Sequence, residues 1–552
     1  MSTLPIDTVP TQAFDDQRPG TSGLRKTVAA FRRPGYLENF FQSILDTLDA
    51  DPDTTWRGRT VVLGGDGRYY NHHALQVFLS MAAANGVGRV VAGTGGRLST
   101  PAASHLVRKR GARGALILTA SHNPGGPDGD FGVKFNNAAG APAPESITEA
   151  VYQRSRQIAE YRICRNAPLD LSRPGELSLG ETRIELIDPV ADYADLMESL
   201  FDFDLIRERV RSGGLRFCFD AMHGATGPYA LEIFGNRLAC PGENLLRCDM
   251  REDFGGAHPD PGPDSAAELM RRLAEPGGPD LGAASDGDGD RNMIAAGGAV
   301  VSPCDSLALL AAQARRVPAF RDGLRGVARS MPTSHALDRV AHALDIPVYE
   351  TPTGWKFFCN LLDDRRIDLC GEESFGTSGN HIREKDGVWA VLFWLNLLAV
   401  RRMPVTDLLA EHWRQYGRDY FTRHDYEALE AERAADFMKA LRDRLPEIAG
   451  RELGDVRVTY ADEFAYHDPV DGSVSEHQGI RVGFSDGARI VYRLSGTGTQ
   501  GATLRVYMER PESDPERQQD DPARALAEVI ERADTVAGIH QRLGREKPDK
   551  TI

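Results

Sequence analysis

Apolar residues in the first 190 positions alternate between helical spacing and short continuous runs. Between residues 36 and 50, one helical face is marked by Phe40, Phe41, Ile44, Leu45 and Leu48. Runs typical of buried strands occupy residues 60–63, 89–92 and 114–120, with helical patterns between them over 75–81 and from 99 onward. This β-α-β-α-β order predicts a mostly parallel sheet covered by helices.

The strand-and-loop unit recurs further along the chain. Apolar strands at 215–220, 326–328 and 367–369 each lead into a loop, without a strong sequence repeat. The pattern therefore predicts several similar α/β domains. From about 421 to 500 strands mix with a charged helix, which predicts a separate α+β domain. The polar residues 1–20 predict a mobile tail, and 547–550 predict a frayed terminus.

Composition narrows the class of protein. The chain has 552 residues, 41% of them hydrophobic, and a formal net charge of −15, so we expect no nucleic acid and no anionic membrane as partner. Its seven cysteines are scattered without a C-x-x-C pair, which favours reduced buried thiols. The N-terminus lacks the features of a secretory signal, and the apolar stretch Val388–Val400 is too short to span a bilayer. We expect a soluble, cytoplasmic protein.

A serine follows one of the predicted strands directly. Ser121 comes after the apolar run 116–120 and opens a loop rich in Gly and Pro, at the strand end where open α/β sheets carry their chemistry. A hydrolase nucleophile is not favoured, because the G-x-S-x-G motif is missing and His122, as the adjacent residue, is poorly placed to act on the serine hydroxyl. Lys134 follows between aromatic residues and is either a surface charge or a desolvated acid/base group.

Three carboxylates with alternate spacing predict a metal site. Asp286, Asp288 and Asp290 occupy a Gly-containing loop, and their hard oxygen ligands suit Mg²⁺ or Ca²⁺. An EF-hand is excluded because its required Gly and Glu positions hold Arg291 and Gly297. A phosphorylated Ser121 would complete the ligands, and Arg291 could hold the same anion.

Two further loops suit a sugar phosphate. Glu372, Glu373 and Ser374 follow a predicted strand and offer the carboxylates and hydroxyl that bind a polyol, although a salt-bridged turn is the simpler interpretation of the stretch 381–387 after them. Residues 496–501 match G-x-G-x-x-G, but the alternating segment 502–507 predicts a strand where a dinucleotide site needs a helix. With Arg493 and Arg505 nearby, this loop suits a free phosphate instead.

These motifs together resemble those of the α-D-phosphohexomutases, and most closely the phosphoglucomutases of the eukaryotic-like branch. The resemblance covers nearly the whole chain and rests on the blocks 20–25, 119–126, 286–291, 351–356, 371–376 and 493–505. It implies an α/β fold of three similar mixed-sheet α/β domains and a smaller C-terminal α+β domain around a central cleft. We expect the domains at 1–190 with the phosphoserine loop, 191–304 with the metal loop, 305–420 with the sugar-binding loop and 421–552 with the phosphate-binding loop.

The resemblance also implies the site. Catalytic roles fall to Ser121 as phosphoserine and to His122, Lys134 and Lys385, and the Mg²⁺ ligands are Ser121, Asp286, Asp288 and Asp290. Substrate contacts fall to Arg25, Asp290, Arg291, Thr353, Gly354, Glu372, Ser374, Lys385, Arg493, Ser495, Thr497 and Arg505. The implied reaction interconverts glucose 1-phosphate and glucose 6-phosphate, with glucose 1,6-bisphosphate as intermediate and activator. We expect a monomer or weak homodimer.

Two other functions remain open at this point. A Mg²⁺-dependent sugar phosphatase would use the same serine but admit water to it, whereas a mutase must exclude water. A non-catalytic scaffold relative would be expected to lose the serine loop or the metal ligands, and both are complete in this chain.

Overall fold

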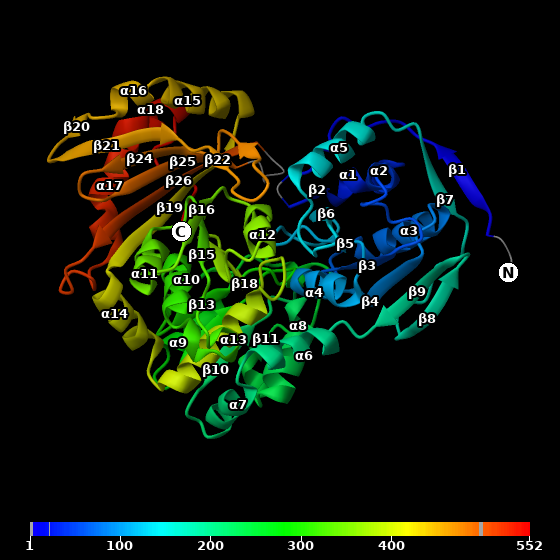
Figure 1. Cartoon of the computed structure of the whole chain (residues 1–552), viewed down its shortest axis with the longest axis horizontal. Coiled ribbons are helices and arrows are strands. Elements are labelled where there is room, and N and C mark those ends of the chain that lie inside the picture. The colour runs from blue at the N-terminus through cyan, green and yellow to red at the C-terminus, as the bar shows by residue number, and fades with distance from the viewer. Residues whose placement is uncertain (1–3, 21, 496–500) are drawn as a thin grey trace. The chain divides into compact units, whose positions relative to one another are not determined.

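The structure, a computed structural model, describes residues 4–20, 22–495 and 501–552. Its chain divides into two compact units (Figure 1). Unit 1 comprises residues 1–301, 313–323 and 374–405, and unit 2 comprises 302–312, 324–373 and 406–552. The fold class expected from the sequence is confirmed, because mixed α/β sheets are followed by a C-terminal antiparallel sheet.

Unit 1 begins with a seven-stranded mixed sheet. Its strands, in spatial order, are β2 (Leu24–Thr27), β6 (Asp130–Asn136), β5 (Ala115–Leu118), β3 (Thr60–Gly65), β4 (Arg89–Arg97), β9 (Thr182–Ile187) and β8 (Gly175–Leu179). The strands β5, β3 and β4 run parallel, as the apolar runs predicted, and β9 pairs with β4 in the same direction. The helices are α1 (Val28–Phe31), α2 (Tyr36–Asp49), α3 (Asn71–Ala84), α4 (Thr100–Arg110) and α5 (Glu145–Ser155). The predicted apolar face of α2 is buried in the core.

A second sheet of unit 1 carries the acidic loop. Its order is β11 (Leu245–Leu246), β10 (Phe217–Asp220), β12 (Leu281–Ala284), β13 (Met293–Ala296) and β14 (Ala299–Val300). The helices of this part are α6 (Ala191–Leu200), α7 (Phe203–Arg211), α8 (Thr226–Ala230) and α9 (Ala267–Ala274). Unit 1 also holds β18 (Gly376–Gly379) and α13 (Gly387–Arg401), and all residues of α13 from Gly387 to Ala399 are buried.

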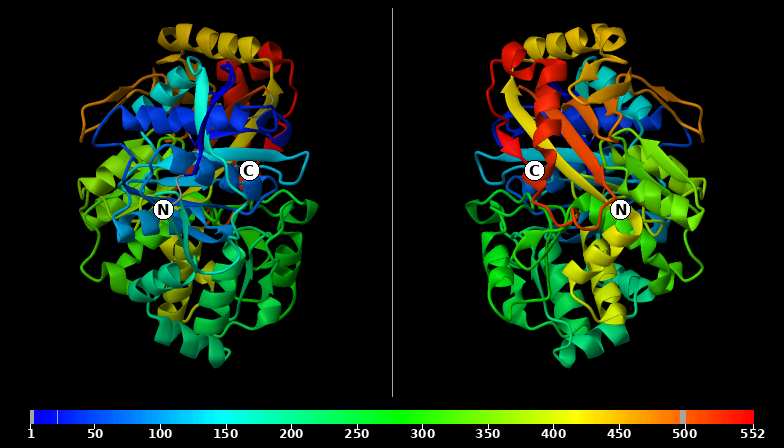
Figure 2. Two further views of the ribbon diagram at one scale, coloured as in Figure 1. Left: turned by 90° about the vertical axis from the view of Figure 1, so that its right-hand side faces the viewer. Right: turned by 90° about the vertical axis from the view of Figure 1, so that its left-hand side faces the viewer.

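Unit 2 has a parallel sheet and an antiparallel one. The parallel strands are β16 (Val348–Thr351), β15 (Val327–Ser330) and β17 (Leu369–Glu372), and the helices of this part are α10 (Pro303–Ala312), α11 (Ala336–Leu344) and α12 (Trp355–Asp363). After α14 (Val405–Tyr416) comes the sheet β20 (Glu452–Leu453), β21 (Val456–Glu463), β24 (Ile480–Phe484), β25 (Arg489–Ser495), β26 (Ala502–Glu512), β19 (Arg418–Leu429) and β27 (Lys550–Thr551). The helices α15 (Ala431–Asp443), α16 (Leu445–Ile448), α17 (Pro522–Ala537) and α18 (Ile539–Leu543), gold to red in Figures 1 and 2, share its core.

Both chain ends are more ordered than the sequence predicted. In place of a mobile tail, β1 (Ile6–Pro10) pairs antiparallel with β7 (Glu160–Cys164). Lys550, the last residue of the expected frayed terminus, begins β27, which pairs with His424 and Asp425 of β19. Both predictions were wrong because these strands are held by main-chain hydrogen bonds, which need no apolar run in the sequence.

The other predictions about composition can be compared with the structure directly. All seven cysteines are buried and none forms a disulfide, as expected of reduced thiols. Among the described residues no single helix has the length and hydropathy to cross a membrane, and one bent pair, α13 with α14, passes that test only when its two helices are combined.

Candidate functional site

The serine loop leaves the end of β5 through a strained residue. Ser121 is 2% exposed and has a φ of +52°, a left-handed conformation that costs an L-residue about 1–2 kcal/mol. Its backbone N–H donates to the Thr119 hydroxyl at 2.8 Å. The loop then returns into β6, where Gly132 is required because a Cβ there would lie 2.2 Å from the Thr119 carbonyl oxygen. Strand ends and hydrogen bonds thus fix where the serine hydroxyl points.

The acidic loop follows β12 and meets the serine loop closely. The Ser121 hydroxyl donates to Asp286 Oδ2 at 2.8 Å, across 165 positions of sequence. A Cβ at Gly287 would lie 2.6 Å from the Ser121 carbonyl oxygen, so this approach requires glycine. The structure therefore brings together the two features that the sequence analysis had singled out separately.

The three carboxylates of the acidic loop form a candidate metal centre. Asp286, Asp288 and Asp290 are at most 4% exposed, and one oxygen of each lies within 4.8 Å of the others. Among the described residues, Oδ1 of Asp288 and Oδ1 of Asp290 are buried with no hydrogen-bond partner. Burial raises the pKa of Asp286 well above its usual range, and its two neighbours raise it further. Buried, unpaired oxygens of like charge fit a divalent cation.

Cationic side chains surround this centre, each with its own carboxylate. Lys134 on β6 is 5% exposed, and its Nζ lies 2.6 Å from Glu384 Oε1. Lys385 Nζ lies 3.1 Å from Asp290 Oδ2. These contacts show that Lys134 is buried, which excludes the interpretation as a surface charge and leaves its acid/base role a prediction.

Two arginines complete this cationic set. Arg291 donates from Nη1 to Asp260 Oδ1 at 3.0 Å. Arg25 lies on β2, and burial lowers its pKa while Asp288 and Asp290 act in the opposite direction. Both guanidiniums therefore belong to the same charged cluster as the acidic loop.

His122 lies closer to the serine hydroxyl than its position in sequence suggested. Its Nδ1 is 3.3 Å from the Ser121 Oγ. This contact contradicts the expectation of poor geometry between the ring and the hydroxyl. Burial lowers the pKa of His122 well below its usual value, and Arg291 and Arg25 lower it further, so the ring is neutral at pH 7.

Unit 2 holds a second group of the predicted residues. Thr353 and Gly354 lie between β16 and α12, and the Gly354 N–H donates to Glu372 Oε1 at 2.9 Å at the end of β17. The Thr353 hydroxyl is buried without a hydrogen-bond partner among the described residues. Ser374, two residues after Glu372, belongs to unit 1.

The predicted phosphate loop connects β25 to β26. Arg493 and Arg505 face each other in register on these strands, as do Ser495 and Thr503. Arg505 Nε lies 3.5 Å from an oxygen of Asp425 on β19. The strand that follows the loop confirms that the glycine motif is not a dinucleotide fingerprint. Thr497 lies outside the described residues.

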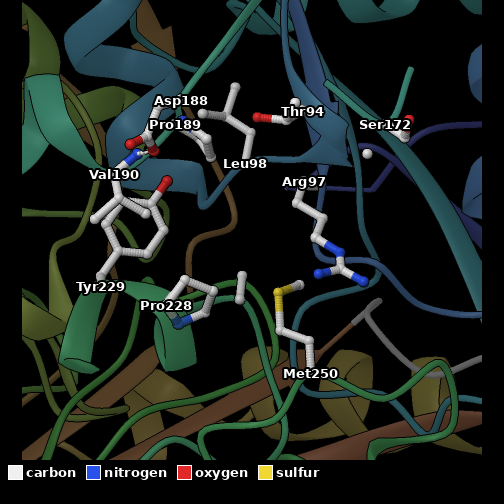
Figure 3. Close-up of a pocket in the computed structure, with 12 residues that line it drawn as sticks. Thr94, Arg97, Leu98, Ser172, Asp188, Pro189, Val190, Pro228, Tyr229 and Met250 are labelled. Carbon is white, nitrogen blue, oxygen red and sulfur yellow. Dashed lines mark hydrogen bonds between the residues drawn. The ribbon is translucent and has the colours of Figure 1, made fainter. Parts of the chain in front are cut away.

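A separate cavity of about 390 Å³ lies in unit 1 (Figure 3). Arg97 and Met250 border one side of it, while Val190 and Tyr229 border the other. Of the described residues predicted for the site, none lines this cavity. It is therefore distinct from the Ser121 centre.

Sequence reasoning missed several partners of the site. Glu384 holds Lys134, Asp260 holds Arg291, and the Thr100 hydroxyl donates to Asp288 Oδ2 at 2.7 Å. Only Thr100 had a signal in the sequence, because it lies at the start of the helical pattern predicted from residue 99 onward. The two acidic residues lie in polar stretches that resemble ordinary exposed turns.

Comparison with known proteins finds matching family models over nearly the whole chain. Models of the phosphoglucomutase/phosphomannomutase α/β/α domains I, II and III match residues 16–162, 191–298 and 303–416, and the phosphoglucomutase-1 C-terminal domain matches 418–549. The chain is 52% identical to a phosphoglucomutase of Rhizobium radiobacter over 98% of this chain and 99% of that one, and 49% identical to human phosphoglucomutase-1 with the same coverage.

A solved structure shows the same fold over the full length. The open form of the Paramecium exocytosis-sensitive phosphoprotein pp63/parafusin, described as a phosphoglucomutase, aligns with a TM-score of 0.91 at 44% identity and covers 100% of both chains. A phosphomannomutase-like protein from Thermus thermophilus, 22% identical over 95% of this chain and 100% of that one with a TM-score of 0.68, shares the fold. These matches show that the chain belongs to the phosphoglucomutase/phosphomannomutase family, as one of its eukaryotic-like phosphoglucomutase enzymes.

Proposed function

We propose that the enzyme interconverts α-D-glucose 1-phosphate and α-D-glucose 6-phosphate through a phosphorylated Ser121. The observation that carries the proposal is the 2.8 Å hydrogen bond between Ser121 Oγ and Asp286, inside a buried carboxylate cluster. A serine beside a divalent-cation site can carry a phosphoryl group, since the cation offsets its charge. Family membership at about half identity over the full chain supports the same reaction.

The proposed metal is Mg²⁺. Asp286, Asp288 and Asp290, with an oxygen on Ser121, would hold it, and when bound it would neutralise phosphate charge and make the phosphorus more electrophilic. The two buried oxygens without protein partners support this assignment, because burying them otherwise costs free energy.

The exchange needs one P–O bond to break and another to form at each transfer. The phosphoryl group leaves Ser121 Oγ for a sugar hydroxyl, that hydroxyl gives up its proton, and Oγ regains one. The result is glucose 1,6-bisphosphate, and return of its other phosphate to Ser121 yields the isomer. We assign proton transfer to the buried Lys134 and the partly buried Lys385, and neutral His122 supports the serine oxygen.

Substrate binding is assigned to two sets of residues. The sugar phosphate would be contacted by Arg25, Asp290, Arg291, Ser374 and Lys385, and the sugar hydroxyls by Thr353, Gly354 and Glu372. Arg493, Ser495 and Arg505 would bind the non-reacting phosphate together with Thr497. The division into domains at 190, 304 and 420 belongs to this proposal, as do the cytoplasmic location and the monomeric or weakly dimeric state.

The test combines an assay with a mass measurement. Wild type should convert glucose 1-phosphate to glucose 6-phosphate only with Mg²⁺, and intact mass should show one phosphoryl group on Ser121 after incubation with glucose 1,6-bisphosphate. Ser121→Ala should lose both, whereas Ser199→Ala, which alters an exposed serine on α6, should keep both. Release of inorganic phosphate at the rate of isomerisation would instead indicate a phosphatase, and an inactive wild type would indicate a scaffold.

A further inference from the structure

The most deeply buried arginine of unit 1 lies directly beneath the serine loop. The side chain of Arg68 is 0% exposed, as is that of Asp66, which accepts from Arg68 Nε at 2.9 Å. The Arg68 guanidinium also donates to the carbonyl oxygens of Ser121 at 2.8 Å, Asp130 at 2.9 Å and Asn123 at 3.4 Å. The Arg68 guanidinium thus joins both ends of the loop. These acceptors offset the free energy that burying its charge costs.

Asp66 reaches the same serine from its other side. Its Oδ2 accepts a hydrogen bond from the Thr119 hydroxyl at 2.6 Å, and the oxygen of that hydroxyl accepts one from the Ser121 N–H at 2.8 Å. The Asp66–Arg68 pair therefore holds the N–H of Ser121 through Thr119 and its C=O directly. Both polar backbone groups of a single residue are tied to one buried ion pair.

This arrangement fits the strained conformation of Ser121. A non-glycine residue with φ of +52° persists only where its surroundings over-determine it. Fixing the peptide groups on each side of the Cα also fixes the Cα–Cβ direction, and hence where the hydroxyl points. The Arg68 guanidinium also makes a cation–π contact with Phe254, at 5.1 Å from the ring centre, which helps to hold it in place.

We infer that Asp66, Arg68 and Thr119 are positioning residues that set the direction of the Ser121 oxygen for phosphoryl transfer. None of them touches the reacting atoms, and each acts through the Ser121 backbone. The inference rests on the proposed function, because it assigns these residues to the same transfer. We call these three residues the clamp. An error of about 1 Å in placing a reacting group can cost about 100-fold in rate, so loss of the clamp should lower kcat.

The sharpest test uses two substitutions of Thr119. Thr119→Val keeps the shape but removes the hydroxyl, so we expect kcat to fall roughly 10- to 100-fold while KM stays close to wild type. Thr119→Ser restores the hydroxyl and should return kcat to within about threefold of wild type. Arg68→Lys keeps the charge but loses the fork that reaches three carbonyl groups, and should resemble Thr119→Val.

A destabilised control separates positioning from folding. Leu45→Ala opens a cavity in the same core far from the loop in sequence, so kcat per folded molecule should be unchanged although the melting temperature drops. Hydrogen exchange of the peptide covering 119–126 gives a readout that does not require activity, and it should be faster in Thr119→Val and Arg68→Lys than in Leu45→Ala.

The outcomes distinguish the two proposals. Wild-type kcat and exchange in Thr119→Val would overturn the inference, as would equal losses in the Val and Ser variants. If the wild type does not isomerise hexose phosphates, the proposed function fails. In that case the exchange experiment still decides whether the clamp restrains the loop.

Discussion

Replacing Asp286 with asparagine should make the metal-free enzyme more stable while destroying its response to Mg²⁺. The three carboxylates have oxygens within 4.8 Å of one another, so each pair of charges repels by about 3 kcal/mol or more at an effective dielectric constant of about 20. Asp286 faces two such neighbours, and Arg291 and Lys385 offset only part of the repulsion. We expect a net gain of about 1–3 kcal/mol in the free energy of unfolding without metal.

The assay is thermal unfolding in a chelator and across a Mg²⁺ series. For a chain of 552 residues, a gain of this size corresponds to an increase of about 1–3 °C in melting temperature. Wild type should gain about 3 kcal/mol at a Mg²⁺ concentration one hundred times its Kd, and Asp286→Asn should gain almost nothing. Asp290→Asn is the matched control, because it removes the same charge but also the 3.1 Å ion pair with Lys385, so its metal-free gain should be smaller.

The reasoning would be refuted by a particular combination of results. If metal-free Asp286→Asn melts below metal-free wild type, repulsion does not dominate at this position. If Mg²⁺ raises the melting temperatures of wild type and Asp286→Asn equally, the cation does not bind at the acidic loop.

Three other predictions test different parts of the molecule. Glu384→Gln removes the buried partner of Lys134, so stability should fall by about 3–5 kcal/mol in urea unfolding and turnover should drop at least tenfold; full activity would exclude Lys134 from proton transfer. Burial lowers the pKa of His412 to about 4 from 6.5, so the unfolded chain takes up the proton first and stability should fall by up to about 3 kcal/mol as the pH drops through that window. His412→Asn should flatten this dependence, whereas His477→Asn, at an exposed position, should not. The seven buried cysteines should react with a thiol reagent only in denaturant, and rapid labelling of the native enzyme would contradict their burial.

The sequence was most informative where side-chain burial alone decides the structure. The strands β3, β4 and β5 and the helices α2 and α4 lie where their apolar patterns placed them, because continuous or periodic apolar positions have one favourable way to be buried. It was least informative at β1 and β27, whose pairing depends on main-chain groups that every residue carries.

The candidate site also combines features that the sequence predicts with features that it does not. Ser121 and the acidic loop stand out because they combine unusual residues with a strand end. Their 2.8 Å contact spans 165 positions, and nothing local specifies it. The short distance from His122 to the hydroxyl depends on torsion angles that no sequence pattern specifies, and Glu384 is recognisable only through its partner on β6. Such features follow from the three-dimensional arrangement and have no pattern of their own.

The junction between α4 and the acidic loop has a consequence for dissecting this enzyme. Thr100 donates to Asp288 twice, from its backbone N–H to the carbonyl oxygen at 2.9 Å and from its hydroxyl to the carboxylate, while Ser121 binds Asp286. The candidate site is therefore formed by residues from two sheets of unit 1, and each sheet resembles an independent folding module. If the two modules were expressed separately, the polar groups that join them would be exposed to water in each one. Exchanging either module with that of a distant relative would therefore require the other module to be exchanged as well.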